Sequence, residues 1–84
     1  MRTMVTWSKF VSSSHKADEI DEYYRGNEVT LTLDSGETMR CEIVGTSVTP
    51  DDEPLVLVRT LPLSKDGVGH VFACDIVQVE GKVL

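Results

Sequence analysis

The chain has 84 residues, of which 40% are hydrophobic and 26% charged, and its 14 acidic and 8 basic side chains give a formal net charge of −6. This composition is typical of one small globular domain and excludes a disordered chain or a coiled coil. The acidic balance argues against tight, non-specific binding to nucleic acids or anionic membranes, since both depend on Lys and Arg. No apolar run approaches the roughly 18 residues of a membrane span.

The first residues, MRTMVTWSKFVSSSHK, mix Ser and Lys with apolar side chains and so lack the apolar core of a signal peptide. We therefore expect a cytoplasmic protein. Its two cysteines, Cys41 and Cys74, are then expected to stay reduced. Both occupy positions at which a strand pattern points inward, which predicts two buried thiols. A disulfide between them, or a thiol switch, remains an alternative.

Residues 1–14 are predicted to form an N-terminal arm ahead of a single domain over residues 15–84. Within the arm, Val5 and Trp7 fit one face of a short strand, whereas Trp7 and Phe10 fit the packing anchors of a loose segment. The sequence leaves both open. A lone tryptophan near a terminus more often covers the edge of a small core than serves as a binding platform, so we expect Trp7 to cover the core.

The stretch HKADEIDEYY predicts a helix over residues 15–24. Three serines before it break the pattern and offer N-cap side chains, and Gly26 suits the position just after the last turn. Ala17, Ile20 and Tyr24 recur on one face, which is the expected buried stripe. The carboxylates of this helix, here named the helix patch, are those of Asp18, Glu19, Asp21 and Glu22.

The helix patch has two interpretations. It is either a solvated face that keeps the protein in solution, or a docking surface for a partner with a basic surface. A second acidic segment between two prolines, here named the turn patch, consists of Asp51, Asp52 and Glu53 and is a candidate for the same role. The helix patch makes a poor metal site, because its carboxylates are not expected to converge with a His or Cys.

The stretch NEVTLTLDSGETMRCEIVG, residues 27–45, predicts the hairpin around which the chain is organised. Apolar and polar residues alternate on both sides of Asp34-Ser35-Gly36, which is the period of half-buried strands. Gly36 can adopt the positive φ of a tight turn at no steric cost. Beyond the hairpin, Gly45-Thr46-Ser47 and residues 49–54 predict an acidic loop, and residues 55–60, 70–74 and 76–79 or beyond predict strands. A second loop is predicted at 61–69, where Pro62 ends the strand and Gly67 and Gly69 permit a turn, and Gly81 marks a bulge or break.

The predicted fold is therefore mainly β. A short N-terminal helix is followed by five short, strongly bent antiparallel strands, which close most cheaply as a small barrel. Closure also removes the sheet edges that promote aggregation. A domain of this size buries only about 60–65% of its unfolded surface, so a partner or self-association would add to its stability.

With a helix followed by five strands, the chain resembles the Sm-like members of the SH3-like barrels over residues 17–80. The first motif of that family is carried here by Val29, Leu31, Leu33, Gly36, Ile43 and Gly45, and the second by Gly69, Val71, Phe72, Ile76 and Val79. The resemblance implies a leading helix and a five-stranded bent sheet. It also implies a homo-oligomeric ring, in which residues 70–74 of one subunit pair with residues 76–79 of the next.

Sm-like proteins bind RNA through an Asp and an Asn in one loop and an Arg-Gly pair in the second motif. This chain has Ala73-Cys74 at the position of that pair, and its loop offers Asp51 and Asp52 without an Asn. The departure puts the RNA site in doubt. If the chain binds RNA nevertheless, Arg40 and Arg59 are the best candidates to contact phosphates.

The chain also resembles, in LTLDSGE and ACDIVQV, the small acidic inhibitors of the Rho terminator (Rof). That group likewise joins a short helix to an Sm-like barrel, and it acts by binding protein. The resemblance implies a binding surface rather than a set of reactive groups. No catalytic or ligand-reading residue is carried over from it.

Catalytic chemistry is not indicated. His15 and His70 are too isolated for a Ser/His/Asp hydrolase, and His70 is expected at a strand edge. The cysteines and histidines lack the paired spacing of a zinc site, and the segment DGVG at 66–69 lacks the Lys-Ser/Thr of a phosphate loop. We therefore expect no enzyme activity, no metal and no cofactor.

The function predicted from the sequence is a non-catalytic protein-interaction or regulatory module, with the helix patch and the turn patch as its docking surfaces. Two alternatives remain. One is an RNA-binding, ring-forming Sm-like protein that uses Arg40 and Arg59. The other is a structural subunit of a larger assembly without an activity of its own.

Overall fold

The computed structural model of the protein describes residues 2–8, 10–60 and 68–83. In this part of the chain, one α-helix, six strands and a single turn of 3-10 helix make up the fold. The elements are β1 (Arg2–Thr6), α1 (Ser13–Tyr24), β2 (Glu28–Leu33), β3 (Thr38–Val48), β4 (Pro54–Thr60), β5 (Gly69–Phe72), η1 (Ala73–Asp75) and β6 (Ile76–Lys82). The mainly β class predicted from the sequence is therefore confirmed. The loop predicted from Gly45 is wrong at its start, because β3 continues through residues 45–47 to Val48, and Gly69 begins β5 instead of belonging to the loop before it.

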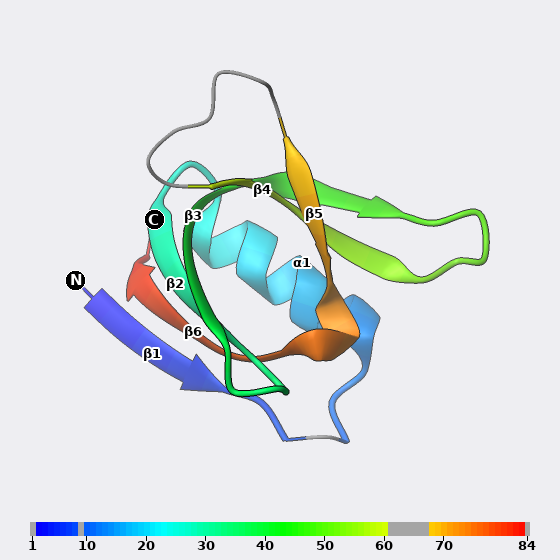
Figure 1. Ribbon diagram of the computed structural model, residues 1–84, viewed down its shortest axis with the longest axis horizontal. Coiled ribbons are helices and arrows are strands. Elements are labelled where there is room, and N and C mark those ends of the chain that lie inside the picture. The colour runs from blue at the N-terminus through cyan, green and yellow to red at the C-terminus, as the bar shows by residue number, and fades with distance from the viewer. Residues whose placement is uncertain (1, 9, 61–67, 84) are drawn as a thin grey trace.

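The strands form one antiparallel sheet in the order β1-β6-β2-β3-β4-β5, with β1 and β5 at its two edges. The sheet bends around α1 without closing (Figure 1). The predicted closed barrel of five strands is thus corrected to an open sheet of six. The additional strand is β1, which finds a partner because β6 continues past Val79 to Lys82 and offers a free edge.

The N-terminal segment is therefore not a loose arm. Its first residues form β1, and Trp7 packs into the core with 8% of its surface exposed, as expected. The helix begins at Ser13 rather than His15, because Ser12 serves as its N-cap. The Ser12 Oγ accepts a hydrogen bond from the backbone N–H of His15 at 3.1 Å. At the other helix end Gly26 follows with a φ of 81°, as predicted.

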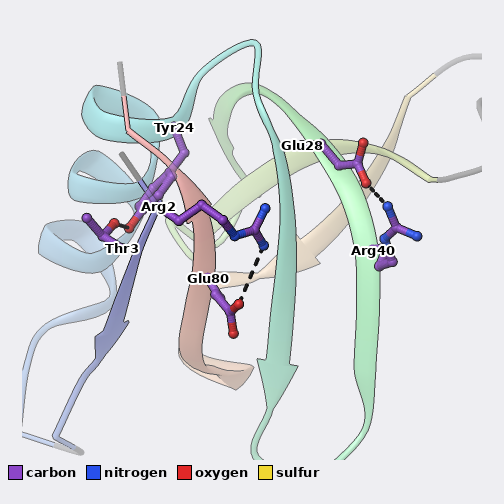
Figure 2. A network of polar contacts seen from close by, with 6 residues as sticks. All are labelled: Arg2, Thr3, Tyr24, Glu28, Arg40 and Glu80. Carbon is purple, nitrogen blue, oxygen red and sulfur yellow. Dashed lines mark hydrogen bonds and ion pairs between the residues drawn. The ribbon is translucent and has the colours of Figure 1, made fainter.

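The core lies between α1 and the concave face of the sheet. Ala17, Ile20 and Tyr24 form the buried stripe of the helix, as the spacing predicts. At the helix end the Tyr24 hydroxyl lies 2.6 Å from the Thr3 hydroxyl of β1, so the edge strand is tied to the helix as well as to β6 (Figure 2). The sheet contributes Val29, Leu31, Cys41, Ile43, Val56, Val58, Ile76 and Val79.

The two cysteines lie in different environments. Cys41 is fully buried on β3, as predicted, and burial raises the pKa of its thiol from 9.0 to about 11. Cys74 is exposed, so the prediction that it points inward is wrong. The reason is η1, which interrupts the strand pattern after Phe72 and buries Ala73 in place of its neighbour. Both cysteines are free thiols.

Two glycines show how backbone geometry constrains this fold. Gly36 has a φ of 92° in the β2–β3 turn, as predicted. Gly81 neither breaks nor ends β6, contrary to the prediction, because the strand continues through it to Lys82. A Cβ at Gly81 would lie 2.7 Å from Val29 Cγ1 and 2.9 Å from the Glu28 carbonyl oxygen. Glycine is needed there because β6 and β2 approach closely.

The predicted ring would need free strand edges at residues 70–74 and 76–79. The strand at 76–79 lies within β6, and both edges of β6 are hydrogen-bonded, one to β1 and the other to β2. A neighbouring subunit could pair with it only if β1 left the sheet. The strand predicted at 70–74 ends earlier, since β5 stops at Phe72. One edge of β5 is hydrogen-bonded to β4. Self-association stays a prediction.

The predicted loop features at Pro62 and Gly67 lie outside the described residues. Among the residues that the structure does describe, no helix is long and apolar enough to cross a membrane.

Candidate functional site

A hollow of about 310 Å³ lies where the first half of α1 meets the ends of β3 and β4. The helix supplies one wall, which carries Asp18, and the strands supply the other, which carries Val48 and Pro54. Val48 is 58% exposed, so the strand wall offers an apolar surface. This hollow, here named the acidic groove, is lined by Ser14, Ala17, Asp18, Thr46, Ser47, Val48 and Pro54.

Asp18 also lines a second hollow, of about 270 Å³, along the same helix. There it is joined by Glu22, one turn further on, and by Tyr23, which is 46% exposed. Like charges at this i,i+4 spacing destabilise a helix by a few tenths of a kcal/mol. Among the described residues, neither carboxylate has an ion-pair partner. A cation bound between Asp18 and Glu22 would relieve their repulsion.

The other two carboxylates of the helix patch are engaged within the chain. Glu19 lies 3.1 Å from Nε2 of His15 and accepts a 3.4 Å hydrogen bond from Nε1 of Trp7. Asp21 forms a bidentate ion pair with Arg25, at 2.8 and 2.7 Å, and this contact raises the pKa of the guanidinium. The helix patch is thus divided, since two carboxylates hold neighbouring side chains and two remain available to a partner.

The turn patch joins β3 to β4 directly beside the acidic groove. Thr49 organises it, because its Oγ1 accepts hydrogen bonds from the backbone N–H groups of Asp51 at 3.2 Å and Glu53 at 3.0 Å. The backbone N–H of Asp52 donates to the Thr49 carbonyl at 2.9 Å. Asp52 has a φ of 67°, a conformation that Asp tolerates better than most residues. Three exposed carboxylates are therefore presented on a hydrogen-bonded turn.

The turn patch and the helix meet at the start of α1. Glu53 and Pro54 line a hollow of about 250 Å³ together with Ser13 and Cys74. Burial raises the pKa of the Cys74 thiol, and the charges of Asp75 and Glu53 raise it further. Because Pro54 lines both this hollow and the acidic groove, the two acidic patches border one continuous surface.

The two arginines proposed to contact RNA lie on the opposite side of the sheet from α1. Arg40 on β3 forms an ion pair with Glu28, and Arg59 on β4 lies 3.3 Å from Glu42. The structure thus brings both arginines to the outer face of neighbouring strands. Each arginine is paired with a glutamate, so a phosphate of RNA would have to displace that glutamate or share the guanidinium with it. RNA binding through these two residues stays a prediction.

Among the described residues, each of the two histidines lies beside a different side chain. His15 is exposed beside Glu19, and His70 is exposed on the edge strand β5, as expected, with its ring edge-on to Phe72 at 6.0 Å. Within residues 2–8, 10–60 and 68–83, no three side chains of His, Cys, Asp or Glu gather closely enough to hold a metal ion.

Comparisons of the chain with models of protein families, with curated proteins and with solved structures give no match. The resemblance to Sm-like and Rof proteins therefore stays a prediction from the sequence.

The apolar component of the site was missed by sequence reasoning. The spacing of apolar residues did not predict that the side chains of Val48 and Tyr23 are exposed at the site. The signal that could have indicated Val48 is the run Thr46-Ser47-Val48-Thr49-Pro50, in which one apolar residue ends a strand among polar neighbours. Its place opposite Asp18 depends on how α1 lies across the sheet, which the local sequence does not encode.

Proposed function

We propose that the protein is a non-catalytic interaction module that binds a basic, partly apolar segment of a partner protein in the acidic groove. The observation that supports this most is the position of Asp18, which lines two adjoining hollows on α1 and faces Val48 and Pro54 across the groove. A bound segment would place a Lys or Arg between Asp18 and Glu22, and an apolar side chain against Val48.

Charge alone would give a weak and unspecific complex. An exposed ion pair contributes only about 0–1 kcal/mol, because the charges stay largely solvated. Complementary charge mainly speeds association and selects among partners. The exposed side chains of Val48 and Tyr23 supply the apolar contact area that a stable complex also needs. The proposed ligand is therefore an amphipathic segment with spaced basic residues, rather than a polycation of any kind.

The test uses a fluorescent peptide that alternates lysine and leucine, with fluorescence anisotropy measured at low and at physiological ionic strength. We expect binding to the unmodified protein and a loss of about tenfold or more in affinity for the double variant Asp18→Lys, Glu22→Lys. Binding is also expected to weaken with salt, since exposed charges are screened over about 10 Å at 0.1 M.

The matched control is Asp34→Lys, Glu37→Lys, which changes two exposed carboxylates in the β2–β3 turn by the same total charge. This control should bind the peptide within about twofold of the unmodified protein. An equal loss in both double variants would show that only the net charge matters. That result, or no loss in either, would contradict docking in the acidic groove.

A further inference from the structure

A cavity of about 430 Å³ opens on the outer face of the sheet, on the side away from α1. Cationic side chains from three strands surround it: Arg2 from β1, Lys82 from β6 and Arg40 from β3. Figure 2 shows Arg2 reaching from β1 across β6 toward β2, while Arg40 lies on the far side of β2. This cavity, here named the cationic pocket, is lined by Arg2, Asn27, Glu28, Val29, Thr30, Arg40 and Lys82.

Two of these cations face each other directly. Arg2 and Lys82 are cross-strand partners in the β1–β6 ladder, and like charges in that position destabilise a sheet. Arg2 is partly compensated by Glu80, at 3.4 Å, whereas Lys82 has no acidic partner among the described residues. The side-chain amide of Asn27 donates to the Lys82 carbonyl at 2.8 Å and holds this end of β6 in place. The sheet thus keeps a cationic pair together without compensating it fully.

The glutamates beside the two arginines are exchangeable partners. The side chains of Arg2 and Arg40 are 61% and 68% exposed, so their ion pairs with Glu80 and Glu28 contribute little to stability. Each guanidinium carries five N–H donors in a planar fork, and one nitrogen of each is used in these pairs. Donors on both arginines therefore remain available to a ligand in the pocket.

We propose that the cationic pocket binds the phosphate group of a small phosphorylated molecule. A phosphate monoester carries a charge of about −1.5 to −2 at neutral pH and has three acceptor oxygens, so it can contact more of the three cations on this lining than the carboxylate of Glu28 does. The Thr30 hydroxyl lies on the same lining and can donate a further hydrogen bond. The volume exceeds that of a phosphate and lies within the range of small-molecule sites, so it leaves room for the rest of the molecule.

This site is independent of the acidic groove, because the two lie on opposite sides of the sheet and share no residue. It overlaps the predicted RNA contacts only at Arg40, since Arg59 does not line it. The proposal therefore adds a small-molecule ligand to a protein-docking module. Either of the two can fail without the other.

The test is a titration of the ¹⁵N-labelled protein with sodium phosphate, followed by amide chemical shifts at low ionic strength, with sodium chloride at matched ionic strength as the reference. We expect phosphate to shift amides of residues 27–30, 40 and 80–82, and to leave residues 14–18 and 46–48 unshifted. The double variant Arg40→Gln, Lys82→Gln should bind phosphate about tenfold more weakly or not at all.

The matched control is Arg25→Gln, Arg59→Gln, which removes the same charge outside the pocket and should bind phosphate as the unmodified protein does. A spectrum with native dispersion shows that each variant is folded. Shifts that chloride reproduces, or that both double variants lose equally, would overturn the proposal. A nucleoside monophosphate and a short single-stranded RNA form two further arms: binding of the nucleotide supports the proposal, and shifts caused by RNA alone would contradict it.

Discussion

The two sides of the sheet handle charge in different ways. On the outer face, Arg2, Arg40 and Arg59 each lie beside a glutamate of a neighbouring strand, so positive and negative charges alternate. On the helix side, the acidic groove runs between Asp18 and the turn patch without a compensating exposed cation on its lining. The helix patch and the turn patch together hold 7 of the chain's 14 acidic residues.

The difference indicates where a macromolecular partner would bind. The three arginines of the outer face are ion-paired, and Lys82 is the one cation there without an acidic partner among the described residues, so this face gains little from a charged protein surface. A side with uncompensated carboxylates next to exposed apolar residues gains from both charge and apolar burial. The same total charge spread evenly over the surface would serve to keep the protein in solution, but it would not mark a docking site.

The largest expected effect tests whether the two sides belong to one cooperative unit. Ile20 is fully buried between α1 and the sheet, so Ile20→Ala should lower the free energy of unfolding by about 2–5 kcal/mol. Urea unfolding followed by far-UV circular dichroism and by Trp7 fluorescence should give coincident transitions. Ile20→Val should cost about 0.5–1.5 kcal/mol and serves if the alanine variant does not fold. Separate transitions would mean that the helix side detaches from an intact sheet.

A smaller effect concerns the buried thiol of Cys41 and its response to pH. Burial raises the pKa of Cys41 from 9.0 to about 11 in the folded protein, so between these values the unfolded chain loses its proton first. Stability is therefore unaffected by this group below pH 9 and falls by about 2 kcal/mol as the pH rises toward 11. Comparing urea unfolding of the unmodified protein and Cys41→Ala at pH 8 and pH 10.5 isolates this loss. An identical pH dependence in both proteins would contradict the assigned burial.

The smallest effect has opposite signs on the two sides. Asp18→Asn removes the repulsion with Glu22 at similar helix propensity and should stabilise the protein by a few tenths of a kcal/mol. Arg40→Gln breaks the ion pair with Glu28 and should destabilise it by about 0–1 kcal/mol. Both changes are read from thermal unfolding at low salt, and both should shrink at 1 M salt. The same sign for both would mean that the two sides do not differ in charge compensation.

The fold could be predicted from the sequence wherever local patterns decide it. The spacing of Ala17, Ile20 and Tyr24 specifies the buried helix face, and the central hairpin follows from alternation and from the φ of Gly36. The sequence did not decide whether the first residues form a strand, because the alternating pattern of β1 covers only five residues. The edge with which β1 pairs is present only because β6 extends to Lys82. The same missing strand explains why an open sheet was taken for a closed barrel.

The candidate site was predictable in part. The composition of the helix patch and the turn patch is visible in the sequence. The sequence does not show that Glu19 and Asp21 bind neighbouring side chains, whereas Asp18 and Glu22 remain available to a partner. Cys74 was misplaced because a 3-10 turn shifts the alternation by one position, and one position reverses the direction of a side chain. Contacts between distant segments, such as Pro54 with the start of α1, arise from packing that local periodicity does not record.

The most direct test of the central claim is to map where the lysine-leucine peptide binds, by amide shifts of the ¹⁵N-labelled protein. We expect the largest shifts at Ser14, Asp18, Glu22 and Val48, around the acidic groove and its neighbouring hollow, with the outer-face residues Thr30, Arg40 and Glu80 unchanged. Shifts spread evenly over all exposed carboxylates, or concentrated on the outer face, would contradict the proposal that this groove is the docking surface.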